Sequence, residues 1–138
     1  MNKIATTFCI VLGLWACKKG TPDPCMCSPV YHGEDSRWQL TEMLMDPGDG
    51  SGTFTPVSSN KQLFLYTNKT VASNGNLCNV SAAAQDSTFG YYNDSTFIIT
   101  TCNSANDTTF IRYEKNQDTL ILTYFCIEPC KEKYIKQQ

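Results

Sequence analysis

Residues 96–126 read TFIITTCNSANDTTFIRYEKNQDTLILTYFC, and this stretch decides the fold class. It holds three runs of β-branched and aromatic residues, at 96–102, 108–114 and 119–126, which predict β-strands. Polar segments rich in Asn and Asp separate these runs, and residues 115–118 are few enough to join the last two as a hairpin. We therefore expect antiparallel strands that follow one another along the chain.

The same signals recur on both sides of this stretch. Residues 38–45 place Trp38, Leu40 and Leu44 on one face of a strand, and the glycine-rich segment 46–52 that follows predicts a loop. Residues 79–87 fit either one helical turn or a loop. Further expected strands are 62–67, 70–73, 88–92 and 131–136. This pattern predicts an all-β fold, a small antiparallel barrel of about eight strands or, alternatively, a β-sandwich.

The N-terminus has the features of an export signal. A positive residue, Lys3, precedes an apolar run at 4–14, which is shorter than the roughly 20 residues that span a bilayer. Leu14-Trp15-Ala16-Cys17 resembles the bacterial lipobox, so we expect a lipoprotein signal peptide at 1–16 and acyl chains, including palmitate, on Cys17. A lipid-anchored flexible tether would cover 17–35 and the folded domain 36–138. The alternative is an ordinary secretory signal in which the cysteine is coincidental.

Cysteine usage also indicates an oxidising compartment. Of the eight cysteines, Cys9 would leave with the signal peptide and Cys17 would carry lipid. We expect Cys126 to bridge Cys130 and Cys78 to bridge Cys102. Cys25 and Cys27 would then pair with each other or with one of these four. The six cysteines expected to form disulfides are Cys25, Cys27, Cys78, Cys102, Cys126 and Cys130.

Several of these features occur together in a known group. Ser36-Arg37-Trp38 opens the expected domain, and the segment 46–57 (DPGDGSGTFTPV), residues 63–67 and the ending 126–130 (CIEPC) follow. In this order they resemble the lipocalin-like domains of small, uncharacterised Bacteroidetes lipoproteins over about residues 36–136. The resemblance implies a small lipocalin-like β-barrel at the cell envelope. It implies no catalytic residues.

Candidate ligand-binding residues come from the expected strands. A barrel of this size either holds one small apolar ligand or is filled by its own side chains. The candidates for lining a pocket are Trp38, Phe64, Tyr66, Phe97, Ile99, Phe110, Tyr113, Leu122 and Tyr124. The alternative is that these residues form a solid core.

Metal binding and catalysis find weaker support in the sequence. Cys25-x-Cys27 with His32 has the ligand types for a soft metal, and Asp46, Asp49 and Ser51 have the oxygens for calcium. We expect neither site, because zinc-type spacing and the bidentate glutamate of an EF-hand are missing, and we expect no cofactor. His32, the only histidine, falls in the tether, so we expect no enzyme activity.

The expected function is therefore binding or structural. The formal net charge is −2 and the sequence has no basic stripe, so nucleic acid is not an expected partner. We expect a lipoprotein of the bacterial cell envelope, in the outer membrane and on either its periplasmic or its surface face, that contacts the membrane through Cys17 and carries a small apolar ligand. The first alternative is an interaction module with a solid barrel core that binds an envelope protein or glycan, and the second is a weak hydrolase.

Overall fold

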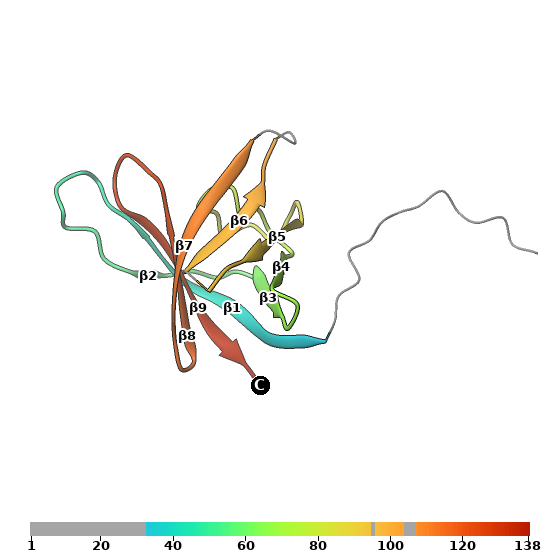
Figure 1. Ribbon diagram of the computed structural model, residues 1–138. Helices are drawn as coiled ribbons and strands as arrows, with labels where there is room; N and C mark the ends of the chain where they lie inside the picture. Colours follow the sequence, from blue (N-terminus) through green and yellow to red (C-terminus); the bar gives the residue numbers. More distant parts are fainter. Residues whose placement is uncertain (1–32, 95, 104–106) are drawn as a thin grey trace, which may run out of the picture.

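The computed structural model describes residues 33–94, 96–103 and 107–138, and these residues form nine β-strands (Figure 1). Strand residues alternate between buried and exposed along β3, β6 and β8, which is the pattern of a sheet with one face on a core. The strands are β1 (Glu34–Met45), β2 (Thr55–Pro56), β3 (Gln62–Tyr66), β4 (Thr70–Ser73), β5 (Thr88–Tyr92), β6 (Phe97–Thr101), β7 (Thr108–Asn116), β8 (Thr119–Tyr124) and β9 (Cys130–Gln137).

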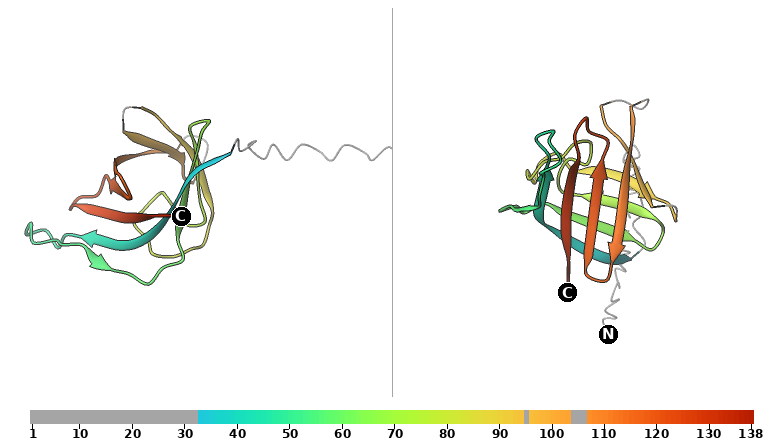
Figure 2. Two further views of the ribbon diagram at one scale, coloured as in Figure 1. Left: turned by 90° about the horizontal axis from the view of Figure 1, so that it is seen from below. Right: turned by 90° about the vertical axis from the view of Figure 1, so that its left-hand side faces the viewer.

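The sheet closes on itself into a barrel. Each strand from β3 to β9 pairs antiparallel with the next, and β9 pairs with β1 from Arg37↔Gln137 to Met45↔Cys130. Figure 2 shows the result, with β9 (red) lying beside β1 (cyan). The prediction of a small antiparallel barrel is confirmed, and the sandwich alternative is not. The two-residue strand β2, which the sequence did not predict, adds to the outer edge of β1.

Side chains occupy the interior of the barrel. Trp38 is fully buried and donates its indole N–H to Ser36 Oγ at 2.8 Å, so the ring's one polar group is satisfied. Each large apolar side chain buried in this way contributes about 1.5–3 kcal/mol before entropic costs. The fully or nearly fully buried apolar residues around Trp38 include Leu40, Leu63, Leu65, Val71, Ile98, Ile111, Leu120, Leu122 and Tyr134.

Most strand boundaries agree with the sequence within two residues, and the differences have local causes. β1 begins at Glu34, because Glu34 pairs with Tyr66 and Thr67 N–H bonds to the Gly33 carbonyl. β8 ends at Tyr124, because a tight turn in which Cys126 N–H donates to the Tyr124 carbonyl takes the chain out of the sheet. Residues 79–87 form a loop without a helical turn.

One end of the barrel carries the long connections, which follow β1, β4, β6 and β8, and we call it the loop end. Both disulfides of the described residues lie there: Cys78–Cys102 ties the β4–β5 loop (residues 74–87) to the end of β6, and Cys126–Cys130 spans the β8–β9 loop (residues 125–129). These are the two pairings expected from the sequence.

Several expectations concern residues that the structure does not describe. Cys17, Cys25, Cys27 and His32 lie outside the described residues, so lipidation and any pairing of Cys25 or Cys27 stay predictions. Within the part that is described, no helix has the length and apolar character needed to cross a membrane.

Candidate binding cleft

The barrel wall has a notch between β7 and β8. β7 pairs with β6 from Thr108 onward, but its pairing with β8 begins only at Arg112, opposite Thr123. The first three residues of β7 therefore extend past the end of β8. In Figure 1 the upper parts of β6 and β7 diverge from the loop that follows β8. The Cys126–Cys130 disulfide and the turn at Tyr124 hold that loop away from β7.

An open cavity of about 790 Å³ lies at this notch, and we call it the β7–β8 cleft. Its volume falls within the range of ordinary small-ligand sites. None of the described side chains that line it carries a charge. Phe125 is 78% exposed and Phe110 is 48% exposed, so apolar surface faces solvent at its rim. The lining residues are Cys78, Asn79, Asn93, Phe97, Thr108, Thr109, Phe110, Tyr124, Phe125 and Cys126.

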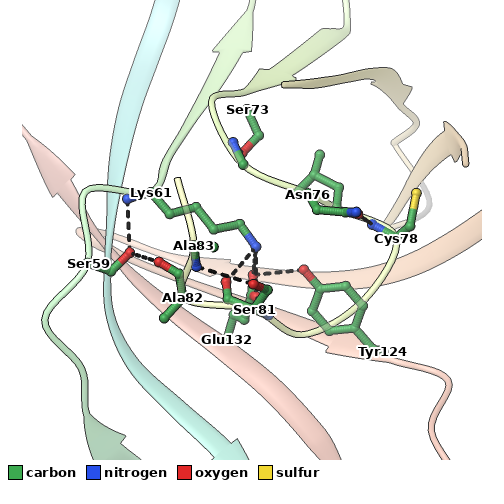
Figure 3. A network of polar contacts seen from close by, with 12 residues as sticks. Ser59, Lys61, Ser73, Asn76, Cys78, Ser81, Ala82, Ala83, Tyr124 and Glu132 are labelled. Carbon is green, nitrogen blue, oxygen red and sulfur yellow. Dashed lines mark hydrogen bonds and ion pairs between the residues drawn. The ribbon is translucent and has the colours of Figure 1, made fainter. Parts of the chain in front are cut away.

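A buried ion pair lies behind the cleft. Lys61, which directly precedes β3, and Glu132 of β9 are both fully buried. Lys61 Nζ donates to Glu132 Oε1 at 2.8 Å and Oε2 at 3.0 Å, and to the Ser81 carbonyl at 3.1 Å (Figure 3). These three bonds use all three ammonium protons, so the charge is fully paired. Burial lowers the pKa of Lys61, and the Glu132 carboxylate opposes that shift.

Two tyrosines complete the environment of this carboxylate. Tyr124 donates its hydroxyl to Glu132 Oε2 at 2.7 Å, and Tyr134 does so at 2.6 Å. Burial raises the pKa of both hydroxyls well above the ordinary value, and the negative charge of Glu132 adds to the shift. Both tyrosines therefore stay protonated as donors. Because Tyr124 also lines the cleft, Glu132 fixes the position of one cleft wall.

The same cluster positions the β4–β5 loop. Ser81 N–H donates to Glu132 Oε1 at 2.9 Å, so both backbone polar groups of Ser81 bond to the buried pair. Ser59 Oγ donates to the Ala82 carbonyl at 2.6 Å. With the Cys78–Cys102 disulfide, these bonds hold Cys78 and Asn79 in place at the cleft.

The structure distributes the nine candidate pocket residues over four regions. Phe97, Phe110 and Tyr124 come together at the cleft. Trp38 and Leu122 are fully buried in the core. Tyr113 packs edge-to-face on Tyr92 at the end opposite the loop end. Phe64, Tyr66 and Ile99 are half-buried and alternate with the inward residues of β3 and β6, which places them on the outer face.

The candidate calcium ligands hold their own loop together. Asp46 Oδ1 accepts the backbone N–H groups of Gly48 and Gly50, at 2.8 and 3.1 Å, and its Oδ2 accepts that of Gly52 at 2.9 Å. Asp49 Oδ1 accepts Ser51 N–H at 2.9 Å. Among the described residues, no group of His, Cys, Asp and Glu side chains is arranged to hold a metal ion. The hydrogen bonds that Asp46 and Asp49 accept agree with the loop that the glycine-rich segment 46–52 predicts.

Sequence reasoning missed Lys61 and Glu132. One signal was available: Glu132 is in phase with Cys130 and Tyr134 on β9, while Lys131 and Lys133 lie on the other face. A carboxylate at an inward position implies a buried partner, but sequence alone does not identify it.

Comparisons with protein-family models, with curated proteins and with solved structures found no match.

The buried pair makes a prediction about stability. Removing one partner leaves a buried charge, so Lys61→Met and Glu132→Gln should each lower the free energy of unfolding by about 3–5 kcal/mol. The double variant should lose clearly less than the sum, with a coupling energy above about 1 kcal/mol. Urea unfolding of the disulfide-bonded protein measures this. The control cycle uses Lys133→Met and Glu42→Gln, a partly exposed pair at 2.9 Å, whose coupling should stay below about 1 kcal/mol. Equal coupling energies in the two cycles would contradict the assignment of Lys61 and Glu132 as a buried ion pair.

The Asp46 loop makes a prediction about acid pH. Backbone N–H bonds, that of Gly48 first, lower the pKa of Asp46. A carboxyl whose folded pKa is depressed contributes stability above its unfolded pKa of about 3.9 and loses that contribution as pH falls through the folded value. An NMR titration of the Asp46 carboxyl carbon should give a pKa below about 3.9, which returns to the ordinary value in urea. A folded pKa at or above the ordinary value would rule out this bonding.

Proposed function

We propose that this protein is a lipid-anchored binding protein of the bacterial cell envelope that recognises an uncharged, apolar ligand in the β7–β8 cleft. The observation that carries the proposal is the cleft itself. It is a cavity of about 790 Å³ with aromatic side chains at its rim, and the described residues that line it are all uncharged. Pockets of this size and composition are the usual sites for apolar ligands.

The filled interior favours the cleft over the centre of the barrel as the binding site. Trp38, Leu122 and Tyr134 are fully buried, and Lys61 with Glu132 takes up the space toward the loop end. A ligand at the centre would have to displace packed side chains or break a buried ion pair, at a cost of several kcal/mol. Binding in the cleft requires neither change, because the cleft is already open to solvent.

The proposed anchor is compatible with a domain held away from a membrane. The lipobox-like Leu14-Trp15-Ala16-Cys17 supports acylation of Cys17, and the described domain begins at Gly33. At roughly 3.4 Å per residue, a fully extended chain between these positions reaches about 50 Å. The cleft would then be accessible to ligands or proteins in the surrounding compartment.

Binding at the cleft is tested with the neutral dye Nile red, whose fluorescence rises in apolar surroundings. Phe125→Ser should weaken dye binding to residues 18–138 by at least about fivefold, because it removes an exposed aromatic wall of the cleft. Ile127→Ser is the matched control: Ile127 is fully exposed two residues further on and does not line the cleft, so its loss should leave dye binding unchanged. Equal effects, or no effect of either change, would refute the proposed site.

The anchor is tested separately. The full chain, expressed in a bacterium that matures lipoproteins, should fractionate with membranes, and its N-terminal peptide should carry the mass of acyl chains on Cys17. Cys17→Ser should abolish both. Cys9→Ser is the control and should change neither, because Cys9 falls in the expected signal peptide. An unmodified Cys17 in the mature protein would disprove the anchor without bearing on the cleft.

A further inference from the structure

The first residues of β7 present to the cleft a strand edge that no described strand pairs with. Cys102 N–H bonds to the Asp107 carbonyl and Tyr113 N–H bonds to the Thr96 carbonyl, both at 2.8 Å. In an antiparallel ladder, alternate residues bond to opposite neighbours. The odd-numbered residues of β7 therefore bond to β6. The backbone N–H and C=O groups of Thr108 and Phe110 must point the other way, toward the place that β8 would occupy.

No strand of the described structure fills that place. The ladder between β7 and β8 begins at Arg112↔Thr123, and the next bonded pair would join Phe110 to residue 125. The tight turn at Tyr124 takes Phe125 out of the sheet before that pair forms. Thr108 and Phe110 are about 6.8 Å apart along the strand, so their backbone groups repeat at the spacing of a β-ladder.

The cleft adds a second wall opposite this edge. Tyr124, Phe125 and Cys126 stand across the cavity from Thr108 and Phe110. A space bounded by a free strand edge on one side and aromatic side chains on the other matches one extended polypeptide. Backbone bonds to the edge would give affinity, and the walls would select side chains.

We propose that the ligand of the β7–β8 cleft is an extended, uncharged polypeptide segment of a partner protein, which adds to β7 as a strand at Thr108–Phe110. This inference rests on the proposed function and names its ligand class. The uncharged lining, as far as the structure describes it, selects apolar and small polar side chains, since a charged group would lose hydration without gaining a partner. The β8–β9 loop, which the Cys126–Cys130 disulfide closes, supplies Phe125 and Cys126 to the same lining.

The test removes one edge donor. Thr108→Pro deletes the N–H that points to the cleft and keeps the ladder with β6, because proline is tolerated at the first residue of a strand and on an edge. Thr108→Val is the matched control, since it removes the hydroxyl but keeps the N–H. Circular dichroism and thermal unfolding establish that both variants fold. The probe is the synthetic form of the peptide most enriched when a phage library of random decapeptides is selected on residues 18–138.

The expected result is wild-type affinity within about twofold for Thr108→Val and at least tenfold weaker binding for Thr108→Pro. The bound peptide should also slow hydrogen exchange of the Phe110 amide. Equal affinity for the two variants overturns the proposal. So does dimerisation of the wild type that Thr108→Pro abolishes, because the occupant is then a second copy. If Nile red binding depends on Phe125 but no peptide is enriched, the peptide inference fails and the proposed function stands. If the dye does not depend on Phe125 either, both fail.

Discussion

The buried carboxylate of Glu132 is the constraint on which the loop end of the barrel depends. It accepts hydrogen bonds from Lys61, Ser81, Tyr124 and Tyr134, which belong to the segment before β3, the β4–β5 loop, β8 and β9. A charge buried without partners would cost several kcal/mol. The four segments are therefore coupled, because moving any one of them away would remove a hydrogen bond from the buried carboxylate and destabilise the fold. The same hydrogen bonds hold part of the cleft wall in place, because Tyr124 and the β4–β5 loop belong to that wall.

Closure of the sheet explains why the cleft occurs where it does. Pairing of β1 with β9 joins the first and last strands of the barrel, so its strand edges are covered apart from short segments at the ends. β7 is longer than β8, and the excess falls at the loop end. A free edge is a liability for aggregation that proteins usually cover or shorten. Here the edge is three residues long and lies in the same cleft as Phe125 and Cys126 of the β8–β9 loop.

Local sequence pattern located every described strand except β2, but it did not identify all of their inward faces. In β3 both faces are apolar, and nothing in Gln62–Tyr66 shows that Leu63 and Leu65 are the buried pair while Phe64 and Tyr66 face outward. The same ambiguity placed Ile99 among the pocket candidates although its neighbour Ile98 is the core residue. Where one face is polar, as at Cys130, Glu132 and Tyr134 with lysines between them, alternation identified the faces but could not supply the partner of the glutamate.

The sequence by itself determined the all-β class and the approximate strands, because these follow from side chains that are near one another in the chain. The pairings Cys78–Cys102 and Cys126–Cys130 were expected from the sequence, but six cysteines allow 15 pairings, and the structure made the choice. It also predicts the lipid anchor at Cys17. Only the tertiary structure decided that Lys61 forms an ion pair with Glu132 and that β7 extends past the end of β8. The first depends on the barrel bringing together side chains that are 71 residues apart, and the second on the turn at Tyr124, which ends β8 two residues before the end that its β-branched and aromatic run predicts.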